Sequence, residues 1–179
     1  MSETAATLQS RAAALRVAFD RSFAVASRAD DRLKHDLIAI RIADEAFAVR
    51  LADISGLFAD RKVVPVPGGH PAQLGIAGFR GTLLPVFSLS MIFVDVARPA
   101  PRWLVVAAAA PVALAFDALE GHLRLPADAI LPRQAQAPRH RMAPEVIRAG
   151  DVLRPLIALP SVIDALGATE APPLQPAQE

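Results

Sequence analysis

Residues 63–89 read VVPVPGGHPAQLGIAGFRGTLLPVFSL, and this stretch decides the fold of the chain. It contains two short apolar segments, rich in residues that favour β-strands, on either side of a Gly-Phe-Arg-Gly turn. Gly78 and Gly81 give the turn backbone the freedom to take positive φ. The pattern therefore predicts a rigid β-hairpin that holds the charged side chain of Arg80 out at its tip, as a protein displays a binding residue.

Short strands of the same kind are expected on both sides of this hairpin. Ile38, Ile40 and Ile42 share one face of an alternating segment, and Arg41 lies on the other face. A first group of strands, at about 37–95, comprises 37–42, 47–51, 54–57, 62–66, 74–79 and 82–87. A second group, at about 100–160, comprises 103–108, 112–116, 121–125, 146–148 and 152–159. Many brief strands with turns between them indicate an all-β (mainly β) domain, built as a barrel or a sandwich.

The two ends of the chain differ from this β pattern. Residues 7–29 lack Gly and Pro and carry apolar side chains at helical spacing, which predicts an amphipathic helix in an N-terminal extension, 1–34. That helix packs on its own domain or serves as an added contact for a partner. Ser161 and the acid three residues later form a capping pattern, which predicts a short helix ending near Gly167. The Pro-rich residues 167–179 are expected to be a disordered tail.

The composition limits the class of protein. With 53% hydrophobic residues and a formal charge of +1 over 179 residues, the chain can form one compact domain or two small subdomains. The absence of cysteine excludes disulfides and thiolate metal sites and fits a cytoplasmic protein. The first residues show no secretory signal, and the longest uncharged stretch, 103–116, is too short to span a bilayer. The near-neutral charge argues against a general nucleic-acid binder.

Sequence patterns for catalysis or metal binding are missing. The chain has no Walker-type phosphate loop, no Gly-x-Ser-x-Gly elbow and no His-Glu-x-x-His helix. None of its histidines has a second one at helical spacing; they are His35, His70, His122 and His140. We therefore expect no catalytic residue, no metal site and no cofactor, and we expect that the chain is not an enzyme.

Three motifs around the hairpin resemble those of the CheW-like family of chemotaxis coupling proteins. That family carries, in order, P-V-P, G-V-I-N-L-R-G and P-V-I-D-L. The counterparts here are Pro65–Pro67, Gly75–Gly81 and Pro85–Leu89, in the same order and at the same spacing. The other expected segments, from Leu37 to about Leu166, also follow the order that the family requires.

The resemblance implies both a fold and a function. The fold is two SH3-like five-stranded β-barrel subdomains within a CheW-like domain at 35–166, with possible chain crossover between the barrels. The function is that of a non-catalytic scaffold, which couples the cytoplasmic tip of methyl-accepting chemoreceptors to the regulatory domain of a CheA-type histidine kinase. Such a protein is cytoplasmic, is recruited to membrane-associated receptor arrays, inserts into no membrane and binds no nucleic acid.

The resemblance also implies which residues bind a partner. Arg80 is the first candidate, together with its neighbours Phe79, Gly78 and Gly81. Asp117 stands near an aspartate of the family pattern and is a further candidate. The planar guanidinium of Arg80 suits carboxylates and backbone carbonyls on a partner.

Several polar positions depart from the family pattern, whereas the apolar framework is kept. Gly78 replaces the family's Asn, and Ser88 and Ser90 stand in place of an aspartate and an arginine. These losses indicate an altered partner surface. Three alternatives stay open: Arg80 as a merely solvated turn residue, a small β-barrel interaction module outside chemotaxis, and a small-ligand binder that uses the groove between the subdomains.

Overall fold

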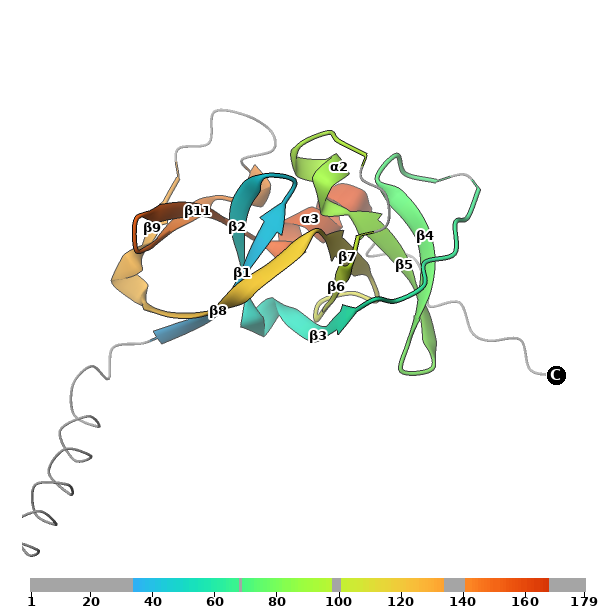
Figure 1. Cartoon of the computed structure of the whole chain (residues 1–179), viewed down its shortest axis with the longest axis horizontal. Helices are drawn as coiled ribbons and strands as arrows, with labels where there is room; N and C mark the ends of the chain where they lie inside the picture. Colours follow the sequence, from blue (N-terminus) through green and yellow to red (C-terminus); the bar gives the residue numbers. More distant parts are fainter. Residues whose placement is uncertain (1–33, 68, 98–100, 134–140, 168–179) are drawn as a thin grey trace, which may run out of the picture. The chain divides into compact units, whose positions relative to one another are not determined.

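The computed structural model describes residues 34–67, 69–97, 101–133 and 141–167, which form mainly β-structure (Figure 1). The strands are β1 (Lys34–Ile42), β2 (Glu45–Arg50), β3 (Ile54–Ala59), β4 (Gln73–Phe79), β5 (Thr82–Ser88), β6 (Trp103–Ala107), β7 (Ala113–Phe116), β8 (Ala118–Pro126), β9 (Ile130–Pro132), β10 (Glu145–Ala149) and β11 (Val152–Ile157). The α-helices are α2 (Leu89–Phe93) and α3 (Leu159–Leu166), and the 3-10 turns are η1 (Leu51–Asp53) and η2 (Ala127–Ala129). The predicted mainly β fold class is confirmed.

The strands form two sheets, and each sheet draws its strands from distant parts of the chain. One sheet has six strands in the order β8-β1-β2-β11-β10-β9, and the other has five in the order β3-β6-β7-β5-β4. The sheets therefore do not correspond to the two stretches expected from strand order, 37–95 and 100–160. The first sheet has one strand more than the expected five, and its outermost strand, β9, is only three residues long.

Two parallel pairings explain why the sheets differ from these two stretches, and they require the chain crossover that the resemblance left possible. β2 and β11 pair in parallel, with Ala48 opposite Leu156. β5 and β7 also pair in parallel, with Val86 opposite Ala113. A parallel neighbour cannot be reached by a hairpin, so the chain has to cross over before it returns. The chain leaves the first sheet after β2, builds the second sheet from β3 to β7, and re-enters the first sheet at β8.

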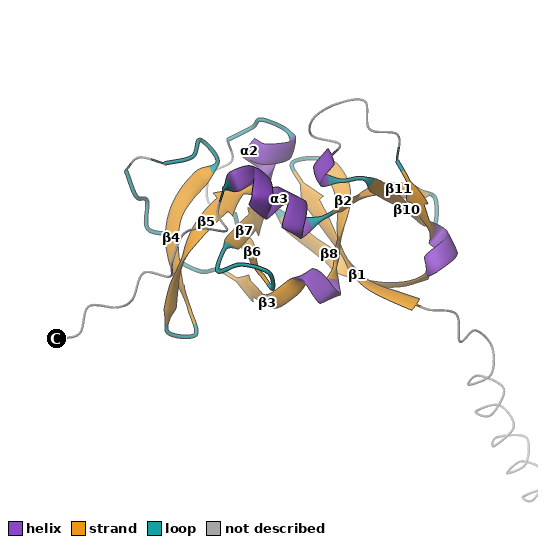
Figure 2. Cartoon of the chain, turned by 180° about the vertical axis from the view of Figure 1, so that it is seen from behind, coloured by secondary structure: helices purple, strands orange, loops and turns teal. Residues whose placement is uncertain are grey.

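The largest cluster of buried side chains is shared by the two sheets. Its members come from both sheets and both helices and include Ile40, Leu89, Leu114, Ile157 and Ile163. Figure 1 and Figure 2 both show α3 lying between the two sheets. The apolar face of α3 therefore closes a core to which both sheets contribute.

Each sheet also has a smaller buried cluster of its own. In the six-stranded sheet this cluster is formed by Leu37, Ala48, Ile147 and Leu156, and in the five-stranded sheet Phe79 and Leu104 belong to it. Successive residues of β1 therefore enter different cores, since Leu37 faces the cluster of its own sheet and Ile38 the shared one. This double burial explains why the strands are apolar on both faces.

The segment at 62–66 was predicted to be a strand, and this prediction is wrong. It makes only one isolated bridge, between Val64 and Ile76. Pro65 and Pro67 lack the N–H groups that a longer ladder would need. The short helix α2 was not predicted, because residues 88–93 continue the apolar run of β5 without a turn signal; the side chain of Ser88 caps its first turn.

Helix α3 confirms the predicted short C-terminal helix, but its beginning differs from the prediction. It starts at Leu159, with Ala158 as the N-cap and Pro160 in the first turn, so Ser161 does not cap it. Proline is well tolerated there, because the first N–H groups of a helix have no intrahelical acceptor. The helix ends at Gly167, with φ 63°, as predicted.

The described residues leave both ends of the chain out. The amphipathic helix expected within 1–34 and the tail expected at 167–179 lie outside them, apart from Lys34 and Gly167. Within the described ranges no helix is long and apolar enough to cross a membrane.

Candidate partner-binding site

Arg80 lies at the tip of the hairpin formed by β4 and β5. The last pair of the ladder joins Phe79 to Thr82, so that Arg80 and Gly81 alone form the loop. Both residues have positive φ, 49° for Arg80 and 86° for Gly81. Two such residues are typical of a type I′ turn, which matches the twist of the two strands. The hairpin therefore defines the backbone position of Arg80, whose side chain is exposed.

Gly78 does not take the positive φ that the sequence predicted for it. It remains inside β4, opposite Leu83, because the loop begins only after Phe79. The backbone requires glycine instead at Gly75, where φ is 142° and an added Cβ would lie 2.1 Å from the carbonyl oxygen of Val64. An added Cβ at Gly78 would meet no atom within 4 Å, so Gly78 leaves open space beside the turn.

Phe79, the last residue of β4 before the loop, is buried, with 4% of its surface exposed, and so anchors the turn in the core. Its ring meets that of Phe58 edge-on, with the ring centres 5.0 Å apart. The guanidinium carbon of Arg80 lies 5.9 Å from the centre of the same Phe58 ring, and that of Arg61 lies 5.2 Å from it. Such contacts between a cation and an aromatic face are attractive.

A groove opens beside the turn. It has a volume of about 470 Å³, and its lining includes Phe58, Phe79, Arg80 and the alanine-rich turn at 107–111. The walls are thus mostly apolar, and Arg80 is the charged side chain among them. Such a groove suits an apolar side chain of a partner next to an anionic group.

Asp117 lies apart from Arg80 and has a structural contact of its own. Its carboxylate accepts a hydrogen bond of 2.5 Å from the backbone N–H of Ala43, which ties the end of β7 to the turn between β1 and β2. β5 and β7 run in parallel; Arg80 precedes β5 and Asp117 follows β7. The two candidates therefore lie at opposite ends of the five-stranded sheet.

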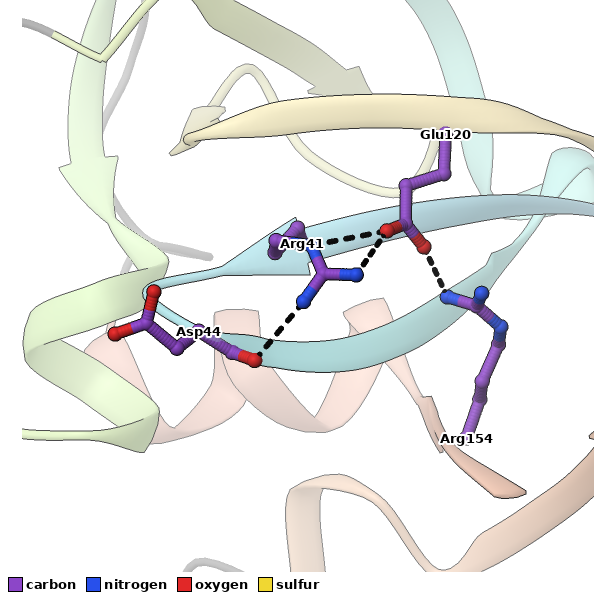
Figure 3. Close-up of polar contacts among 4 residues, drawn as sticks. All are labelled: Arg41, Asp44, Glu120 and Arg154. Atoms are coloured by element: carbon purple, nitrogen blue, oxygen red, sulfur yellow. Dashed lines mark hydrogen bonds and ion pairs between the residues drawn. The ribbon is translucent and has the colours of Figure 1, made fainter. Parts of the chain in front are cut away.

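Sequence reasoning missed a polar cluster in which two arginines flank Glu120 (Figure 3). The Nε of Arg41 donates to Glu120 at 2.9 Å, and Arg154 donates to the other carboxylate oxygen. Partial burial favours a higher pKa for Glu120, but the hydrogen bonds and positive charges of Arg154 and Arg41 outweigh it and lower the pKa. The three residues join β8, β1 and β11, and the only sequence signal was Arg41 on the face opposite to the isoleucines.

The arrangement offers nothing that resembles a metal centre in the described ranges. No three His, Asp or Glu side chains gather there in a way that could hold a metal ion. Of the histidines, His70 accepts a hydrogen bond from the backbone of Ala72, and His122 pairs with Asp36. The contact of His122 joins β8 to β1.

The comparisons with known proteins agree with this architecture. A family model described as the CheW-like domain matches residues 36–165. Among solved structures, the scaffolding protein TtCheW from Thermoanaerobacter tengcongensis is similar, with a TM-score of 0.64 and 15% sequence identity over 70% of this chain and 90% of that chain. At this identity the likeness shows a shared fold. No curated protein sequence matches the chain. Since the family model covers most of its length, the chain belongs to the CheW-like domain family.

Proposed function

We propose that this chain is a non-catalytic adaptor that couples chemoreceptors to a CheA-type histidine kinase. Its partners are the cytoplasmic tip of methyl-accepting chemoreceptors and the regulatory domain of the kinase. The adaptor works in the cytoplasm and is recruited to membrane-associated receptor arrays. Membership of the CheW-like family supports this proposal.

The observation that carries the proposal is the position of Arg80. An arginine in a left-handed conformation costs free energy that glycine or asparagine would avoid, and here it lies exposed beside a largely apolar groove. Gly81 permits the turn, Phe79 supports it, and Gly78 leaves room for the backbone of a partner. Asp117 stabilises the turn between β1 and β2 through its hydrogen bond with Ala43. It lies at the end of the five-stranded sheet opposite to Arg80.

The test is calorimetric titration of the full chain with each of two fragments from the same cell, the kinase regulatory domain and the receptor tip. We expect wild-type protein to bind both. Arg80→Asn keeps a residue that tolerates the left-handed turn and removes the guanidinium, so we expect at least one affinity to fall about tenfold. Unchanged affinities would mean that Arg80 is only a solvated turn residue.

A second candidate is an interaction module outside chemotaxis that binds an extended peptide along a strand edge. It is favoured by the position of β3, an edge strand of the five-stranded sheet; the other edge strand, β4, already pairs at Ile76 with Val64. Wild-type protein that binds neither chemosensory fragment would favour this candidate.

A further inference from the structure

Two arginines from different loops lie against one aromatic ring at the candidate site. Arg61 follows β3, and Arg80 lies at the tip of the β4–β5 hairpin. Their guanidinium carbons lie 5.2 and 5.9 Å from the centre of the Phe58 ring. Phe58 is itself held by the edge of the buried ring of Phe79. Both guanidiniums therefore lie close to the same ring. We call Arg61, Phe58 and Arg80 the arginine clamp.

Neither guanidinium of the clamp has an acidic partner within the described ranges. Other arginines of the same ranges do: Arg50 pairs with Glu145, Arg154 with Glu120, and Arg102 with Asp60. The acid closest in sequence to Arg61, Asp60, is therefore engaged by Arg102 at 3.3 Å. Arg61 and Arg80 are both exposed, and so is Lys62, the residue after Arg61.

Two exposed positive charges near one ring create a positive surface potential, which favours a ligand of negative charge. Carboxylates on one segment laid across this surface can accept charge-assisted hydrogen bonds from Arg61 and from Arg80. The groove beside Arg80 has largely apolar walls that include Phe58 and Phe79, and Arg61 lines a neighbouring hollow with Lys62. The complementary ligand therefore combines carboxylates with an apolar side chain.

We infer that the arginine clamp binds a carboxylate-bearing segment of the partner protein, and that an apolar side chain of that segment enters the groove. This inference rests on the proposed function and names the chemistry by which the site recognises its partner. Arg61 is then a second residue that binds the partner's carboxylates, although it lies outside the motifs of the hairpin. Because both contacts are ionic and exposed, the affinity has to fall as salt rises.

The experiment measures the dissociation constants of the full chain for the kinase regulatory domain and for the receptor tip, at low and at high NaCl concentration. The variants are Arg61→Gln, Arg80→Asn, the double variant and Arg148→Gln. Arg148 is an exposed arginine on β10 in the other sheet and serves as the matched control. Thermal melting followed by circular dichroism checks that each variant is folded.

For the fragment that binds through the clamp, we expect Arg61→Gln to weaken binding about five- to tenfold at low salt and to make its salt dependence shallower. The double variant should bind more weakly than either single variant, and Arg148→Gln should bind as wild type does. A folded Arg61→Gln variant with the wild-type affinity and salt dependence for both fragments would overturn the inference and leave the proposed function standing. Wild-type protein that binds neither fragment would overturn both.

The chain itself carries two acids near its C-terminus, Glu170 and Glu179, which could compete for the clamp. The full-length variant Glu170→Gln/Glu179→Gln distinguishes this case. We expect its affinity for the fragments to equal that of wild type. A several-fold gain in affinity would mean that the chain's own carboxylates occupy the clamp, and would overturn the assignment to a partner segment.

Discussion

Around Arg80, single residues divide into those whose role could be read from the sequence and those whose role could not. The Gly-Phe-Arg-Gly motif predicted the turn and its exposed arginine, because apolar strands on both sides leave few other conformations. It could not reveal that Gly78 stays in the strand, since this depends on the length of the loop. Nor could it reveal Arg61, which meets Arg80 only through Phe58, more than twenty residues earlier in the chain.

A pair of glycine substitutions tests this description of the hairpin. Gly75→Ala would place a Cβ against the backbone of Val64 at positive φ, and we expect it to lower the free energy of unfolding by about 2 kcal/mol. Gly78→Ala meets open space in a strand and should change it by less than about 0.5 kcal/mol. Urea denaturation of both variants gives the values. Equal losses in the two variants would contradict the backbone described here.

Among the elements, the strands formed by alternating or apolar runs were predicted well, and their partners were not. β1, β4, β5, β6 and β7 lie close to their predicted positions, because β-branched and aromatic residues mark them. Their neighbours in the sheets depend on crossovers of the chain, which local sequence does not encode. The same holds for the cluster around Glu120, whose arginines lie 79 and 34 residues away from it.

Glu120 connects three strands, so its removal is expected to destabilise the six-stranded sheet. Glu120→Gln leaves the positive charges of Arg41 and Arg154 without their shared carboxylate, and the side chain of Arg154 is only 13% exposed. We expect a loss of about 2 kcal/mol in the free energy of unfolding at neutral pH. Glu45→Gln, at an exposed glutamate of β2, is the control and should lie within about 0.5 kcal/mol of wild type.

The effect of Glu120→Gln is also expected to depend on pH. Because folding lowers the pKa of Glu120, its carboxylate stabilises the folded state at pH values above the ordinary glutamate pKa. That stabilisation is lost as the pH falls through the lowered pKa of the folded state. The difference in stability between wild type and Glu120→Gln should therefore shrink in acid. A difference that stays constant down to the acid limit of folding would show that the pKa is not lowered.

At the scale of the whole domain, the shared core makes the two sheets one folding unit. Ile40 of β1 is fully buried in that core, together with residues of β5, β6 and β7. The sequence indicated the apolar residues but not that two sheets would share them, since this again follows from the crossovers. Trp103, the only tryptophan of the chain, begins β6 in the five-stranded sheet and packs against the same core.

This organisation predicts that a substitution that destabilises one sheet also destabilises the other. Ile40→Ala leaves a cavity and should lower the free energy of unfolding by about 3 kcal/mol. We expect the unfolding midpoint followed by Trp103 fluorescence to move as far as that followed by circular dichroism. Leu131→Ala, at an exposed position of β9, is the control and should move neither midpoint measurably. A Trp103 transition that Ile40→Ala leaves unchanged would mean that the sheets unfold independently.

Coupling through the Arg80 turn is tested most directly by titrating wild-type protein and Arg80→Asn with the kinase regulatory domain and the receptor tip under the same conditions. We predict that wild type binds both fragments and that Arg80→Asn, although folded, loses about tenfold in affinity for at least one of them. Binding of both fragments with wild-type affinity by Arg80→Asn would contradict the role of Arg80. Failure of the wild-type protein to bind either fragment would contradict the coupling function itself.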